Sequence, residues 1–189
     1  MPAYTLFGIF WIAQVLATSV VRERHAGTLR RLHASPLGVG VLLLGKAAPY
    51  YVINLLQIVI MFAVAALGFG LDLGASPVAL GVVSLVAAAV STSLGAMVAS
   101  LVHTEEQAGS VTILVLLVLA GLGGCFVPAF VMPAWMRDVG LFTPHAWALG
   151  AYQDVLVRGL GLREVLPKLG VLLGFAVSFA AIARWRFRL

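Results

Sequence analysis

The sequence has few charged residues and almost no cysteine. Asp, Glu, Lys and Arg make up only 10% of its 189 residues, whereas a soluble domain carries about 25%. This shortage excludes an ordinary soluble enzyme and a disordered segment, because both expose charged side chains to water. The single cysteine, Cys125, excludes a disulfide scaffold. Hydrophobic residues make up 62% of the chain and its mean hydropathy is +1.08, which indicates an integral membrane protein.

Five apolar segments are long enough to cross a membrane as helices, which takes about 20 residues each. They cover residues of about 3–21, 47–71, 78–102, 108–127 and 169–183. We therefore predict an all-α polytopic membrane protein, in which residues 1–189 form a single transmembrane domain.

The positive charge is concentrated in two stretches, residues 22–46 and 184–188. Lys and Arg are enriched on the cytoplasmic side of membranes, so we place both stretches and the C-terminus in the cytoplasm, and residues 128–168 outside. The net charge of +5 then reflects orientation in the plasma membrane, with no nucleic acid as partner. The first span would start outside, so either the N-terminus crosses unaided or an upstream span is missing.

No catalytic or metal-binding constellation stands out in the sequence. Residues 40–46 match the phosphate-loop pattern G-x-x-x-x-G-K, but Ala47 replaces the Ser or Thr that ligates magnesium. His103 lies near Glu105 and Glu106, and a solvated loop explains these residues better than a metal site without a third ligand type. We expect no catalytic residue, no metal and no ATPase site in this chain.

Polar residues recur at helical spacing in the first two predicted spans. They are Gln14 and Thr18 in the first span, and Tyr50, Asn54 and Gln57 in the second. Amides in hydrocarbon need partners, so these faces should point toward protein or a watery path. Hydrogen bonds between helices are favoured over substrate contact, and both interpretations stay open.

The third span carries a stripe of small residues that includes Ser91, Gly95 and Ala99. Small side chains let two helix backbones approach closely. We predict that this stripe packs against another helix, in the same chain or in another copy.

Residues 128–168 are too interrupted by proline to form a span. Trp135, Phe142, Trp147 and Tyr152 suit the headgroup level, and His145 is predicted to be an interfacial residue and not a base. We expect a short re-entrant or interfacial pair of helices here.

Residues 22–36 are predicted to contain a short amphipathic helix that ends before Pro36. Leu29 and Leu32 share one face, and arginines supply charge. The segment is either a basic loop that meets anionic headgroups or a docking helix for a cytoplasmic partner.

Several motifs in order along the chain resemble the ATP-binding-cassette type 2 transporter permease family. They are Glu23-Arg24-His25-Ala26-Gly27-Thr28-Leu29-Arg30-Arg31-Leu32 with Ser35-Pro36, then Gly45-Lys46, Gln107-Ala108, Gly123-Gly124-Cys125-Phe126-Val127-Pro128, Met132-Pro133, Pro144-His145-Ala146-Trp147-Ala148 and Arg158-Gly159. The match covers essentially the whole chain, and it is most similar to the drug and antibiotic exporters of that family.

The resemblance implies an all-helical half-transporter in the plasma membrane that pairs with a second permease copy, as a homodimer or a heterodimer. It also implies separate cytoplasmic ATPase subunits that bind ATP and magnesium. The implied coupling residues are Glu23, Gly27, Thr28, Leu29, Arg30, Arg31 and Leu32. The implied function is export of a small hydrophobic or amphipathic substrate. Family members usually have six spans, and a truncated or non-transporting membrane scaffold is the alternative.

Overall fold

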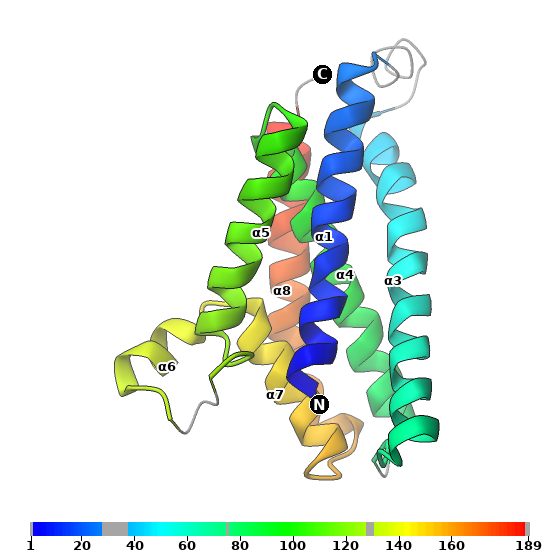
Figure 1. Cartoon of the computed structure of the whole chain (residues 1–189), viewed down its shortest axis with the longest axis vertical. Helices are drawn as coiled ribbons and strands as arrows, with labels where there is room; N and C mark the ends of the chain where they lie inside the picture. The colour runs from blue at the N-terminus through cyan, green and yellow to red at the C-terminus, as the bar shows by residue number, and fades with distance from the viewer. Residues whose placement is uncertain (1, 28–37, 75, 128–130, 188–189) are drawn as a thin grey trace.

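The computed structural model describes residues 2–27, 38–74, 76–127 and 131–187. Its helices are α1 (Pro2–His25), α3 (Val39–Phe69), α4 (Pro77–Leu101), α5 (Glu105–Leu122), α6 (Ala134–Gly140), α7 (Pro144–Leu156) and α8 (Leu162–Arg186) (Figure 1). Five of them, α1, α3, α4, α5 and α8, are long and apolar enough to cross a membrane. The predicted all-α membrane protein is therefore confirmed.

The helices extend beyond several of the predicted span boundaries. α3 begins at Val39 and not near residue 47, so the stretch 40–46 that matches a phosphate loop is helical. α8 begins at Leu162 and continues through the whole predicted fifth span. α5 ends earlier than predicted, at Leu122, because Gly123 caps it and Gly124 takes a φ of 86° that a helix cannot continue.

The five long helices stand side by side, with α6 and α7 at one end of the bundle (Figure 1). α1 starts at that end, which we call the α6–α7 end, and α8 finishes at the other. The other end, the basic end, gathers the last turns of α1, α4 and α8 and the first turns of α3 and α5. α4 lies at the centre of the packing and contacts α8, α1, α3, α7 and α5.

Short polar side chains fix where three helices begin. The hydroxyls of Ser76, Thr104 and Thr143 accept hydrogen bonds from backbone N–H groups in the first turns of α4, α5 and α7. Pro77 and Pro144 follow two of these caps, where a missing N–H has no cost. α3 differs, because it contains Pro49 in its interior.

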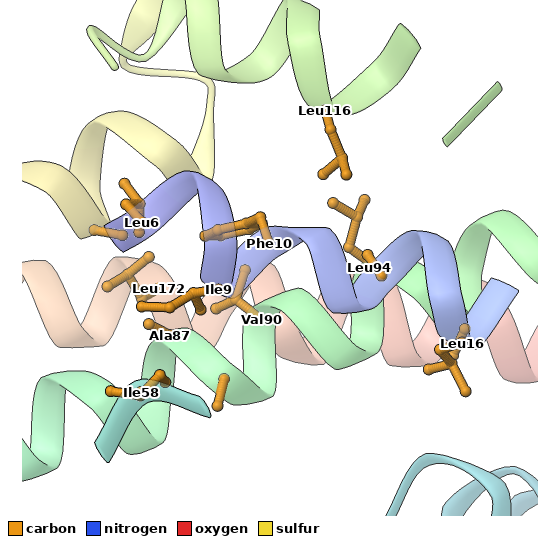
Figure 2. Close-up of a cluster of buried hydrophobic side chains, with 14 of the residues drawn as sticks. Leu6, Ile9, Phe10, Leu16, Ile58, Ala87, Val90, Leu94, Leu116 and Leu172 are labelled. Carbon is orange, nitrogen blue, oxygen red and sulfur yellow. The ribbon is translucent and has the colours of Figure 1, made fainter. Parts of the chain in front are cut away.

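The core is formed where α1 crosses α4. Leu6, Ile9, Phe10 and Leu94 are almost completely buried there (Figure 2). The two backbones approach so closely that a Cβ added to Gly95 would lie 2.6 Å from the carbonyl oxygen of Ala13. Close approach of this kind requires small residues, because any larger side chain would meet the opposite backbone.

Candidate functional site

The last turn of α1 is joined to two other parts of the basic end. Glu23 forms an ion pair with Lys46 in α3. The guanidinium of Arg24 donates to the carbonyl of Val102, which follows α4, at 2.5 Å. The ring of His25 lies 2.6 Å from the carbonyl oxygen of His103. Each of these contacts holds the end of α1 against a neighbouring element.

The connection between α4 and α5 is itself well ordered by local hydrogen bonds. The backbone N–H of His103 donates to Gln107 Oε1, and the N–H of Gln107 donates to Thr104 Oγ1, both at 3.1 Å. The connection therefore offers α1 a fixed carbonyl at His103. Within the described ranges, no group of three His, Cys, Asp or Glu residues is arranged to hold a metal ion.

The predicted coupling segment begins in the last turn of α1, at the basic end. Of its residues, Glu23 lies in the last turn of α1, and Gly27 follows with a φ of 73°, a left-handed conformation that glycine adopts readily. The residues Thr28, Leu29, Arg30, Arg31 and Leu32 lie outside the described residues. The chain is described again from Gly38, which caps α3 at the same end.

The predicted polar face of the second span lies in α3, and one of its residues contacts α1. Gln57 donates from Nε2 to the carbonyl of Gly8 at 3.0 Å, so it bonds between helices. Asn54 is completely buried, and neither atom of its amide has a hydrogen-bond partner among the described residues. Tyr50 is half-buried against the core.

The polar pair of the first span lies on a different side of α1. Thr18 donates to the carbonyl of Gln14 at 2.9 Å, which is a bond within one helix. A Cβ on Gly109 of α5 would lie 3.9 Å from Gln14 Nε2, so Gln14 faces α5. The structure therefore does not bring Gln14 and Thr18 together with the amides of α3.

The small-residue stripe of α4 lies against α1. Ser91 is completely buried and donates to the carbonyl of Ile9 at 2.8 Å, while Gly95 contacts Ala13. Ala99 is completely buried as well. The neighbour of this stripe is a helix of the same chain.

His145 and Tyr152 are buried between helices of this chain and are not exposed side chains. His145 is completely buried, with its ring centroid 3.9 Å from that of Phe10 in α1. Burial lowers the pKa of His145 to about 3, so its imidazole is neutral. Tyr152 is 1% exposed and donates to the hydroxyl of Ser84 at 3.1 Å. Both residues are buried because α7 folds back against α1 and α4.

A buried carboxylate in α7 was missed by the sequence reasoning. Asp154 accepts hydrogen bonds from Arg158 and from Lys168 of α8, both at 2.5 Å. Lys168 passes beside Gly150, where a Cβ would lie 3.1 Å from its Nζ. The i, i+4 spacing of Asp154 and Arg158 is visible in the sequence, but the long-range partner Lys168 is not.

Comparison with known proteins identifies similar membrane proteins. The linearmycin resistance permease protein LnrN of Bacillus subtilis is 26% identical over 166 residues, which cover 87% of this chain and 43% of that protein. The probable multidrug ABC transporter permease YbhR of Escherichia coli is 26% identical over 175 residues, covering 92% of this chain and 47% of that protein. The chain thus spans about half the length of these relatives.

A more distant eukaryotic relative is ABC transporter G family member 20 of Dictyostelium discoideum, 23% identical over 171 residues. The alignment covers 89% of this chain and 23% of that protein. A family model described as ABC-2 family transporter protein matches residues 1–185, nearly the whole chain, and confirms the resemblance seen in the sequence. The chain belongs to the ABC-2 transporter family.

Proposed function

We propose that this chain is the membrane-spanning permease part of an ATP-driven exporter. It moves a small hydrophobic or amphipathic substrate out of the cell, with energy from a separate cytoplasmic ATPase subunit. Family membership and the drug-related names of the two bacterial relatives support this role. One structural observation carries the mechanism: the last turn of α1, from which the coupling segment leaves, is joined to α3 and to the α4–α5 connection.

Energy must enter this chain through a surface contact with the ATPase. Residues 40–46 lie in the first turns of α3, where the backbone N–H groups of Val41 and Leu42 bond to the carbonyl of Gly38. A helical backbone with bonded N–H groups cannot cradle phosphates, and Ala47 supplies no hydroxyl to magnesium. In this proposal ATP and magnesium are bound by the partner ATPase subunit.

The coupling segment contains both apolar anchors and charges. Leu29 and Leu32 would fill a cleft on the ATPase, and Arg30 and Arg31 would orient the contact. Gly27 and Thr28 lead into the segment, and Glu23 links its base to Lys46. A movement of the coupling segment caused by the ATPase would then displace the last turn of α1 together with α3 and the α4–α5 connection, which are bonded to it. This arrangement requires the basic end and the C-terminus to be cytoplasmic.

The polar residues inside the bundle serve packing in this proposal. Gln57 bonds to α1 and Thr18 bonds within it. Asn54 is the exception, because its buried amide lacks a partner among the described residues. We assign substrate movement to the interface with a second permease copy, since Gln14 faces α5 whereas Asn54 is buried in α3.

The test of coupling uses the double variant Leu29→Ala, Leu32→Ala. The full-length protein is reconstituted in vesicles with its ATPase subunit, and substrate-stimulated ATP hydrolysis is measured. Loss of two apolar anchors should lower the stimulated rate at least about tenfold, because such anchors dominate binding energy. The matched control is Leu141→Ala, Leu166→Ala, which removes two exposed leucines at the α6–α7 end.

Four outcomes would contradict the proposal. The double variant could couple normally, or the control could lose coupling equally. The purified protein alone could hydrolyse ATP. An assembly that binds the ATPase but shows no substrate-stimulated hydrolysis would be a non-transporting scaffold.

A further inference from the structure

An apolar groove runs between α3, α4 and α8 in the half of the bundle toward the basic end. Its volume is about 650 Å³, within the range of about 300–1,000 Å³ that is typical of ligand sites. The walls come from Leu43, Ala47 and Ala48 of α3, Ala89 and Ala96 of α4, and Ala180 of α8. The groove exists because most of these side chains are alanines and α3 contacts α8 only sparsely.

The hydroxyl groups in the wall are all bonded to backbone carbonyls of α4. Thr92 donates to Ala88 at 2.7 Å, and Ser93 donates to Val90 at 2.9 Å. Tyr51 reaches across from α3 to the carbonyl of Leu85 at 3.2 Å. Since these donors are already satisfied, the groove presents hydrocarbon to its occupant.

The length of the groove corresponds to one leaflet of a bilayer. Along α3 it extends from Gly40 to Tyr51, which at 1.5 Å per residue is about 16 Å. The hydrocarbon core of a bilayer is about 30 Å thick, so the groove reaches roughly to its middle.

The mouth of the groove is positively charged. The guanidinium of Arg184 lies against the first turn of α3, 3.3 Å from where a Cβ on Gly40 would be. Arg184 is exposed and forms no ion pair within the described ranges. The next residue, Trp185, is 77% exposed, as is typical of tryptophan at the headgroup level. A negative group at the mouth would meet Arg184 at the depth of lipid phosphates.

We propose that this groove binds an acyl chain of an anionic phospholipid, with the lipid phosphate held by Arg184. The apolar wall contacts the acyl chain, and the length of the groove matches an acyl chain that reaches the middle of the bilayer. The guanidinium of Arg184, which has no ion-pair partner among the described residues, favours a negatively charged headgroup. Because the basic end carries the cytoplasmic charge signature, the lipid comes from the inner leaflet. This site is independent of the proposed coupling to an ATPase.

Lipid binding is measured on the purified protein in neutral detergent by native mass spectrometry. The probes are phosphatidylglycerol and phosphatidylcholine with identical acyl chains. The protein should bind one phosphatidylglycerol with at least about tenfold preference, because the choline ammonium of phosphatidylcholine offsets the charge of its phosphate and is repelled by Arg184. Arg184→Gln should abolish the preference and Arg184→Lys should retain most of it. Arg163→Gln, which removes an exposed arginine at the other end of α8, should leave it unchanged.

Filling the groove tests the acyl-chain part of the proposal. Ala48→Trp should weaken binding of both lipids about tenfold, and Ala180→Trp on the opposite wall should do the same. Ala63→Trp, at an exposed position of α3 outside the groove, is the matched control. Equal affinity for the two lipids, or no response to Arg184→Gln, would overturn the proposal. A tryptophan variant that keeps its lipid but turns a dimer into a monomer would assign the groove to a second copy.

Discussion

α4 and α3 are both long apolar helices, yet they are held in the molecule by different means. In the most apolar stretch of α4, 67% of the residues are buried, compared with 17% in that of α3. α4 is held by close backbone packing against α1, with Gly95 at the contact. α3 faces outward for most of its length and is held by a few buried side chains such as Ile58 and by isolated polar contacts such as Gln57 to Gly8. Packing makes α4 the fixed part of the bundle, whereas α3 depends on a few side chains.

Gly95→Leu should lower the stability of the protein most, because it disrupts the close packing of α4 against α1. The new side chain would meet the Ala13 backbone, whose oxygen and Cα lie 2.6 and 2.8 Å from the added Cβ. Backbone atoms cannot rotate away, so we expect a loss of about 3 kcal/mol in the free energy of unfolding in detergent. Gly81→Leu on the same helix, with nothing within 4 Å, is the control. Equal stability of the two variants would show that α1 and α4 are not in close contact.

Asp154→Asn should have the next largest effect, because it removes a buried charge that α7 shares with α8. The Asp154 side chain is 5% exposed and binds both Arg158 and Lys168. Leaving Lys168 without its carboxylate should cost about 2 kcal/mol, below the range for a fully buried pair because Lys168 is 26% exposed. Arg158→Gln should cost less than about 1 kcal/mol, since that side chain is 62% exposed. Thermal unfolding of both variants distinguishes the two contributions, and a larger loss for Arg158→Gln would reverse this assignment.

His145 should make the packed region sensitive to acid. The folded-state pKa of about 3 lies below the ordinary value of 6.5, so the unfolded chain binds more protons between these pH values. Stability should therefore fall as pH drops below about 6.5, by roughly 1 kcal/mol per pH unit. His145→Phe should abolish this slope when unfolding is compared at pH 7 and pH 5. His103→Gln, at an exposed position, should retain it. A slope that persists in His145→Phe would assign the acid sensitivity to another group.

Gln57→Leu should have the smallest effect, although it removes a contact that holds α3. Hydrogen bonds between membrane helices contribute on average about 0.6 kcal/mol, and Gln57 makes one such bond to Gly8. Chemical unfolding of this variant, compared with Gln153→Leu at an exposed position of α7, should show a difference of that size. A loss as large as that of Gly95→Leu would mean that α3 is held as firmly as α4.

The span helices could be predicted from the sequence, and the contacts between their ends could not. Runs of about twenty apolar residues determine a membrane helix through local composition alone. The burial of His145 and Asp154 depends on α7 folding back onto α1, α4 and α8, which no local pattern records. Arg24 likewise meets a carbonyl 78 residues away. The spacing of Ser91, Gly95 and Ala99 indicates a close neighbour but does not identify it as α1.

Pro49 divides α3 into a short first part and a longer second part that are joined by a less rigid turn of helix. Proline has no N–H to bond to the carbonyl of Gly45, and its ring crowds that carbonyl, so a helix is least stiff at this point. Lys46, which is joined to Glu23 of α1, lies before Pro49, while Gln57, which is joined to Gly8, lies after it. A displacement of the end of α1 therefore acts on the short part of α3 that precedes Pro49. Bending at Pro49 would let the residues before it move while the rest of α3 stays attached to the start of α1.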